Sequence, residues 1–342
     1  MQYPATVSAG DRVAIVSPSS GLPEILPLPF ELGLRRLEHD FGLIPVEYPT
    51  TRRMGASPQE RAADVNAAFA DPTITAVISS IGGDDQITVL PYLDPDLLRA
   101  NPKRFFGFSD CTNLLAYLAS LGIVSYHGGA VMTAFGRPGA MHPMTEESLR
   151  AALFTGGEYR LRESTDFTDI GKVWADPATF ETEPQMLPGT GWEWHGPRRV
   201  VTGDAWGGCL EIVAWLLMAD RCVPDDVTGK VLFFETSEET PSAIEVYRIL
   251  RNMGERGFLS QASALLFGRP MAWTLENPID DAERRDFVSR QRDAVLRAVA
   301  EYAPDLPVVL GLDIGHTDPQ LILPYGGQVT VDSLARSITV VH

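Results

Sequence analysis

The first 120 residues alternate short apolar runs with stretches of helical spacing, and this alternation most constrains how the chain folds. The apolar runs are residues 11–16, 44–46, 75–80 and 105–108. Strands that alternate with helices are typical of a parallel sheet with helices on its faces. Such sheets bind ligands at the carboxyl ends of their strands. We therefore expect an α/β protein whose site lies where Ser17, Gly82 and Ser109 follow their strands.

The second half of the chain is organised differently. Regular spacing is lost over residues 156–199, where glycine, proline, threonine and tryptophan dominate, and a β-rich tail closes the chain from 321 to 341. A chain of 342 residues is long for a single core, so two domains are expected. We predict an N-terminal parallel α/β domain over residues 1–160 and a C-terminal β-rich domain over residues 161–342.

The fourth apolar run ends in Gly107-Phe108-Ser109-Asp110 and passes directly into a helical segment, 112–121. This pattern predicts a strand that turns sharply into a helix with a serine hydroxyl at the turn. Backbone N–H groups at a helix start have no partner within the helix and can receive a developing oxyanion. Ser109 is therefore a candidate nucleophile. The local sequence leaves open that Ser109 or Asp110 only caps the helix.

A second turn, Gly82-Gly83-Asp84-Asp85, follows the third apolar run at the same expected sheet edge. Glycine permits close backbone approach, so an N–H of this turn is a candidate half of an oxyanion hole, together with the N–H of Asp110. The glycine patterns of phosphate-binding loops are missing here. A plain turn remains the alternative interpretation.

A nucleophilic serine requires a base and a group that orients the base. Of the six histidines, His127 and His316 follow apolar runs, and flanking glycine and proline make His316 the stronger candidate. Glu235 ends the apolar run 231–234, where a carboxylate is expensive to bury without a partner such as an imidazole. The alternative is that Glu235 simply begins a solvated acidic loop.

Composition excludes several classes of function. The formal net charge of −17 opposes binding to nucleic acid, and the three cysteines show no metal-ligand or disulfide spacing, so we expect no metal and no cofactor. No run is long and apolar enough for a membrane span, and the N-terminus lacks a signal-peptide pattern. We expect a cytoplasmic protein with no membrane partner.

Several motifs in order resemble the serine LD-carboxypeptidase family, which includes the microcin C self-immunity peptidases. The resemblance covers nearly the whole chain and is carried by motifs at 16–20, 80–83, 90–94, 107–110, 206–210, 234–239 and 315–316. It implies a catalytic triad of Ser109, Glu235 and His316, with an oxyanion hole at Gly82, Gly83 and Asp110. It also implies a flavodoxin-like N-terminal sheet, a β-rich C-terminal domain and a homodimer.

The resemblance leaves specificity open between a peptidyl-nucleotide and a murein tetrapeptide. Cys209 replaces the asparagine that many members carry after the paired glycines, and the segment 235–239 is more similar to the microcin-immunity branch. Trp174, Trp192 and Trp194 are candidates for stacking on a nucleobase. The alternative is that these tryptophans pack the domain junction, and a murein peptide would instead require an arginine for its terminal carboxylate.

Two other functions are compatible with parts of the pattern. An α/β-hydrolase shares the chain order serine, acid, histidine, but Cys111 stands where its motif requires a second glycine. A non-catalytic peptide-binding or nucleotide-binding member of the family would retain the fold without activity. Retention of all three catalytic residue types argues against this last function.

Overall fold

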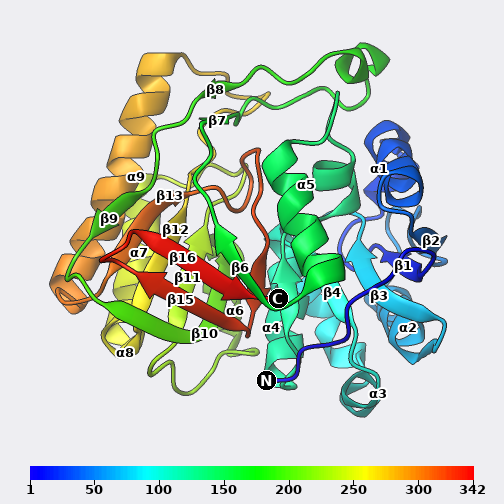
Figure 1. The fold of residues 1–342 in the computed structure, drawn as a ribbon, viewed down its shortest axis with the longest axis horizontal. Coiled ribbons are helices and arrows are strands. Elements are labelled where there is room, and N and C mark those ends of the chain that lie inside the picture. The colour runs from blue at the N-terminus through cyan, green and yellow to red at the C-terminus, as the bar shows by residue number, and fades with distance from the viewer.

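The computed structural model describes all 342 residues and contains two large β-sheets that lie side by side, with helices around and between them, and one two-stranded sheet (Figure 1). In the view of Figure 1, both chain ends lie in the region where the two halves meet. No helix combines the length and the apolar character that a membrane crossing requires. The predicted α/β fold with a parallel N-terminal sheet and a β-rich C-terminal part is confirmed.

The N-terminal sheet has six strands in the order β14-β5-β4-β3-β1-β2. Five of them come from the first half of the chain and run parallel: β1 (Arg12–Val16), β2 (Ile44–Glu47), β3 (Ile74–Ser79), β4 (Arg104–Gly107) and β5 (Ser125–His127). The sixth, β14 (Leu323–Tyr325), comes from the C-terminal part and pairs antiparallel with β5. The predicted strands are thus present, and one strand crosses from the second half.

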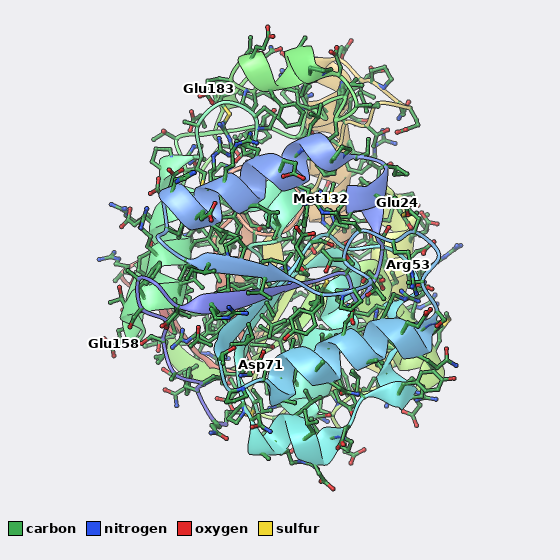
Figure 2. All side chains as sticks on the ribbon, turned by 90° about the vertical axis from the view of Figure 1, so that its right-hand side faces the viewer. Glu24, Arg53, Asp71, Met132, Glu158 and Glu183 are labelled. Atoms are coloured by element: carbon green, nitrogen blue, oxygen red, sulfur yellow. The ribbon has the colours of Figure 1, made fainter.

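Alternate residues of β1 point to opposite faces of this sheet, as a strand buried on both sides requires. Val13 and Ile15 pack with α1 (Pro27–His39), whereas Ala14 and Val16 pack with α2 (Pro58–Ala70). Figure 2 looks toward the β2 edge and shows α1 and α2 on the two sides of the sheet. The other helices of this half are α3 (Pro95–Ala100), α4 (Thr112–Ser120) and α5 (Pro143–Arg150).

The C-terminal sheet has eight strands in the order β6-β16-β15-β10-β11-β12-β13-β9. Its parallel part is β10 (Val200–Cys209), β11 (Val231–Glu235), β12 (Ala264–Gly268) and β13 (Val308–Leu312). Antiparallel strands flank it: β6 (Glu158–Leu161), β9 (Glu193–His195), β15 (Gln328–Asp332) and β16 (Ser337–Val341). Its helices are α6 (Leu210–Ala219), α7 (Ala243–Glu255), α8 (Phe258–Gln261) and α9 (Asp281–Tyr302).

A single apolar cluster joins the two halves, because α4 packs against both α6 and β10. The expected boundary between residues 160 and 161 falls inside β6, which belongs to the C-terminal sheet. The irregular segment that follows contains the short strand pair β7 (Asp166–Phe167) and β8 (Leu187–Pro188) and one short helical turn before β9. It runs across the top of the molecule in Figure 1. This segment brings its residues close to both sheets.

Short single-turn helices complete the chain. They are Leu22–Glu24, Gln86–Thr88, Leu90–Tyr92, Ser109–Cys111, Val131–Phe135, Ala151–Thr155 and Pro177–Glu181. The turn Ser109–Cys111 lies between β4 and α4, at the carboxyl edge of the N-terminal sheet.

Candidate active site

Ser109 occupies a strained turn between β4 and α4. Its φ is +59°, in the left-handed region that a non-glycine residue rarely adopts. A turn of this kind holds a serine hydroxyl away from the backbone and at the start of a helix, as in a nucleophile elbow. Neither Ser109 nor Asp110 caps α4, whose N-cap residue, Cys111, forms no side-chain capping bond. The capping interpretation of this turn is therefore wrong.

The side chain of Asp110 holds the Ser109 turn in place. Its carboxylate accepts hydrogen bonds from the backbone N–H of Gln86 at 2.9 Å and from the side-chain amide of Asn113 at 2.8 Å. Burial raises the pKa of Asp110 to about 6, against the opposing effect of the Gln86 bond. Gln86 in turn accepts the backbone N–H of Leu114 at 2.9 Å. The loop after β3 is thus tied to the Ser109 turn.

Gly82 lies directly against Ser109. A Cβ atom at Gly82 would stand 2.9 Å from Ser109 Cβ, 3.2 Å from Ser109 Oγ and 3.4 Å from the backbone nitrogen of Asp110. Only glycine permits this approach without displacing the serine. A Cβ atom at Gly83 would instead meet the side chain of Ser19 and both the backbone nitrogen and the side chain of Ser20. The two predicted oxyanion-hole segments therefore lie side by side.

His316 and Glu235 form a direct pair. Glu235 ends β11 and is fully buried, and its Oε2 lies 2.6 Å from Nδ1 of His316. Gly315 makes this contact possible, because a Cβ atom there would collide with the Glu235 carboxylate. The other ring nitrogen of His316, Nε2, has no hydrogen-bond partner, although Glu238 Oε2 lies 3.2 Å away. The His316 side chain lines the same cavity as Ser109.

The pair has the electrostatics of an ion pair. Burial alone would raise the pKa of Glu235, but the charge of His316 and the hydrogen bond to it lower that pKa overall. Burial alone would lower the pKa of His316, but Glu235, followed by Glu238 and Glu211, raises it. The imidazolium form of His316 is thus stabilised by three carboxylates on its own half of the molecule.

The cavity has a volume of about 480 Å³ and lies where the two halves meet. Gly82, Gly83, Ser109 and His316 line it. Most charged groups in its wall are engaged within the protein, since Arg137 pairs with Asp318 at 2.6 Å and Asp169 pairs with Arg284 at 3.0 Å. Lys172 has no ion pair or hydrogen bond. Lys172 is thus a cation available to a ligand.

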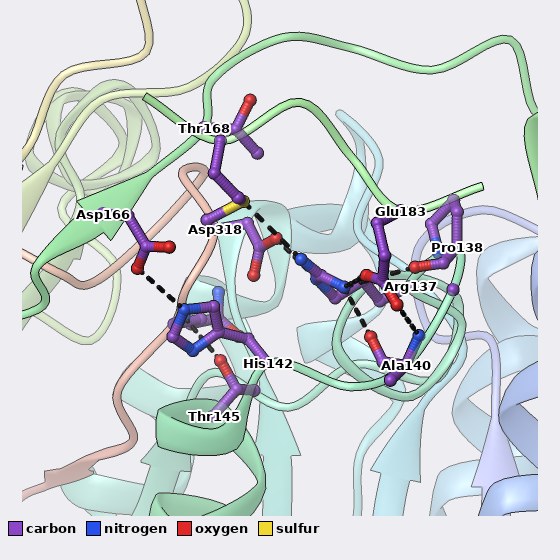
Figure 3. Close-up of polar contacts among 12 residues, drawn as sticks. Arg137, Pro138, Ala140, His142, Thr145, Asp166, Thr168, Glu183 and Asp318 are labelled. Atoms are coloured by element: carbon purple, nitrogen blue, oxygen red, sulfur yellow. Dashed lines mark hydrogen bonds and ion pairs between the residues drawn. The ribbon is translucent and has the colours of Figure 1, made fainter. Parts of the chain in front are cut away.

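Arg137 fastens the irregular segment over this cavity (Figure 3). It contacts Asp318, two residues after His316, and Glu183 in the irregular segment, each at 2.6 Å. Glu183 also accepts the backbone N–H of Ala140 at 2.7 Å. One arginine from the N-terminal half therefore holds both the histidine loop and the segment that carries Trp174.

The three predicted tryptophans separate in the structure. Trp174 lines the cavity. Trp192 is buried and donates its indole N–H to Asp313 at 3.1 Å, and Trp194 packs on the core from β9, with its Nε1 buried. Neither Trp192 nor Trp194 lines the cavity, so the expectation that all three face it is corrected to Trp174 alone.

Two further residues lie near the pair of Glu235 and His316. Glu238 follows in the acidic segment after Glu235, lines the cavity and faces His316. His127 was a weaker candidate for the base, and the structure buries it behind Glu235, away from the cavity wall. The cysteines are not alternative nucleophiles at the cavity, because Cys111 and Cys209 are buried as protonated thiols whose pKa burial raises.

Comparison with protein families identifies the class. Residues 13–128 match the LD-carboxypeptidase N-terminal domain and residues 202–331 match the LD-carboxypeptidase C-terminal domain. The chain belongs to the LD-carboxypeptidase family. The family and the names of its members indicate carboxypeptidase activity.

Relatives fall in both branches expected from the sequence. The chain is 28% identical to the microcin C7 self-immunity protein MccF of Escherichia coli, over 82% of this chain and 78% of the relative. It is 25% identical to a probable murein peptide carboxypeptidase of Bacillus subtilis, over 98% of this chain and 93% of the relative. A putative carboxypeptidase of Vibrio cholerae is 26% identical over 97% and 95% of the two chains.

Solved structures share the fold over the whole chain. Wild-type MccF in its apo state superposes with a TM-score of 0.85 at 25% identity, covering 99% of this chain and 98% of that one. An MccF-like protein from Streptococcus pneumoniae in complex with AMP superposes with a TM-score of 0.84 at 27% identity, covering 97% and 98%.

Proposed function

We propose that the chain is a serine hydrolase that cleaves an amide bond with Ser109 as nucleophile, His316 as general base and acid, and Glu235 as the group that orients His316. The observation that carries this proposal is the 2.6 Å contact between Glu235 Oε2 and His316 Nδ1, which leaves Nε2 without a hydrogen-bond partner. A histidine oriented by a carboxylate and a strained serine that line the same cavity are the groups that nucleophilic acyl transfer requires.

The reaction then follows from these positions. His316 Nε2 takes the hydroxyl proton of Ser109 as Oγ attacks the carbonyl carbon. The oxyanion forms beside Gly82, Gly83 and the N–H of Asp110, and His316 passes the proton to the leaving amine. Water, activated by the same imidazole, then releases the acyl group from Ser109.

The acyl-transfer step distinguishes this function from a non-catalytic binder. A serine-directed fluorophosphonate should label Ser109, as located by peptide mass spectrometry, and Glu235→Gln should slow that labelling. A family member that only binds ligands would leave Ser109 unlabelled. The α/β-hydrolase interpretation is superseded by membership of the LD-carboxypeptidase family.

For the substrate, we propose a peptidyl-nucleotide or aminoacyl-nucleotide. Trp174 offers a stacking surface in the cavity, and Lys172 beside it in sequence offers an uncommitted charge for a phosphate. The arginine expected for a murein carboxylate is less suited, because Arg137 in the cavity wall is already bound by Asp318 and Glu183. The MccF-like relative in complex with AMP supports the same choice.

Substrate comparison tests this specificity. We expect kcat/KM for a peptidyl-nucleotide to exceed that for a murein tetrapeptide, and Trp174→Ala to lower only the former. Trp194→Ala is the matched control, because Trp194 lies outside the cavity wall. Efficient release of D-alanine that is unaffected by Trp174→Ala would assign the protein to the murein carboxypeptidases instead.

A further inference from the structure

Glu235 has a second carboxylate oxygen that the proposed triad does not use. Oε2 holds His316, whereas Oε1 is buried with no hydrogen-bond partner. A buried, charged acceptor that lacks a partner is costly to the fold. Nε2 of His127 is within reach of this oxygen, at 3.6 Å.

His127 also lacks hydrogen-bond partners. It is the last residue of β5, it is fully buried, and neither of its ring nitrogens has a hydrogen-bond partner. The ring is held by edge contacts with Phe108, the residue before the candidate nucleophile, and with Phe233 in β11. Burial lowers the pKa of His127 to about 4, against the opposing charge of Glu235. The imidazole is therefore neutral and carries one N–H in a dry setting.

We propose that His127 is a positioning residue, whose Nε2–H donates to Glu235 Oε1 and so holds this carboxylate between two imidazoles. This role depends on the proposed function, in which Glu235 orients the general base His316. The separation of 3.6 Å exceeds a formed hydrogen bond, and contacts of this kind tighten in substrate complexes.

Such a contact has two consequences for the chemistry. It fixes the orientation of Glu235, because both carboxylate oxygens then have partners from different strands and loops. It also keeps the negative charge on Glu235 while His316 holds the serine proton, because a neutral donor stabilises the carboxylate without competing for its charge. In metal sites, mutation of a residue that hydrogen-bonds to a ligand typically lowers affinity or activity by about 10–100-fold, and we expect a similar range here.

The tautomer of His127 in the wild-type protein tests the contact without reference to activity. Nitrogen-15 NMR should show His127 neutral, with the proton on Nε2 and a bare Nδ1, and His127→Gln assigns the resonance. A proton on Nδ1, or a charged imidazolium near neutral pH, would overturn the proposal even if the protein proves to be a hydrolase.

Two substitutions test the positioning role. His127→Leu, which removes the donor, should lower kcat by about 10–100-fold and leave KM within about twofold. His127→Gln, which returns an N–H donor, should restore most of kcat. Equal kcat values for the two variants, whether high or low, would contradict the role.

His342→Leu is the matched control, because His342 is also buried and neutral but lies at the chain end, against Tyr126 and Tyr159. It should leave kcat unchanged. If His127→Leu fails to fold, the tautomer and the His127→Gln kinetics still decide. If the wild-type protein shows no turnover, the proposed function is wrong. The tautomer measurement would still report on the contact between His127 and Glu235.

Discussion

At the scale of single residues, the charges around His316 set the pH at which this proposed general base loses its proton. Burial would lower the pKa of His316, but Glu235, Glu238 and Glu211 raise it to about 9, while His127 behind Glu235 stays neutral. A general base must be unprotonated. We therefore expect kcat/KM to fall as the pH drops below about 9. A pH profile of kcat/KM, repeated in overlapping buffers, measures this.

Glu238→Gln should move this acid limb to lower pH. The substitution removes a negative charge 3.2 Å from His316 Nε2, so the imidazolium loses stabilisation and its pKa falls. Glu239→Gln is the control, because Glu239 is exposed and absent from the cavity wall. An acid limb that stays in place, or moves to higher pH, would show that Glu238 does not act on His316.

Gly82→Ala should lower kcat by about 10²-fold or more, with little loss of thermal stability. The added methyl would lie 2.9 Å from Ser109 Cβ, where it displaces the serine and obstructs the space beside the Asp110 nitrogen. Steady-state kinetics together with a melting curve separate the two effects. Wild-type kcat in the folded variant would remove this turn from the oxyanion hole.

The place of a residue could be predicted where the neighbouring sequence determines it, and not where long-range packing determines it. The Gly-x-Ser-Asp turn could be predicted, because an apolar run meets a helical segment at a serine. Trp192 and Trp194 look equivalent to Trp174 in sequence, yet the partner of Trp192, Asp313, lies 121 positions away. Glu238 is equally ambiguous, since only the fold brings it to His316.

At the scale of elements, the helices with capping boxes were the most predictable. Ser57–Glu60 and Ser242–Glu245 carry the Ser-x-x-Glu pattern of a capping box, and both form it. Asp280–Glu283 carries the related Asp-x-x-Glu pattern and forms a capping box at the start of the long helix α9. The pairing of β14 with β5 depends on a contact about 200 residues apart, which no local pattern encodes.

Arg137→Ala should release the irregular segment over the cavity. The variant loses the contacts to Glu183 and Asp318 that join this segment to the N-terminal half. Hydrogen exchange should accelerate over about residues 168–186. Arg52→Ala, which breaks ion pairs with Glu31 and Glu47 and a contact with Phe30, all outside this segment, should not change exchange there. Unchanged exchange over this segment would show that Arg137 does not fasten it.

At the scale of the whole molecule, the proposed reaction uses serine, histidine and a carboxylate drawn from both halves. We therefore expect turnover to survive exhaustive treatment with EDTA, followed by desalting. No group of three or more histidine, cysteine, aspartate or glutamate side chains is arranged to hold a metal ion. Loss of turnover that zinc alone restores would contradict the serine mechanism.

The resemblance to the family also predicts a homodimer, which the fold of one chain does not test. Sedimentation equilibrium should give a mass twice that of the 37.4 kDa chain. A single-chain mass at micromolar concentration would contradict the expected dimer.

The covalent chemistry of Ser109 is the most direct test of this account. Rapid quenching of wild-type enzyme with an amide substrate, followed by mass spectrometry, should show the acyl group on the peptide that contains Ser109. Ser109→Ala should fold normally and form no adduct, and its kcat should be lower by about 10⁴-fold or more. A folded Ser109→Ala protein with wild-type turnover would contradict the central claim.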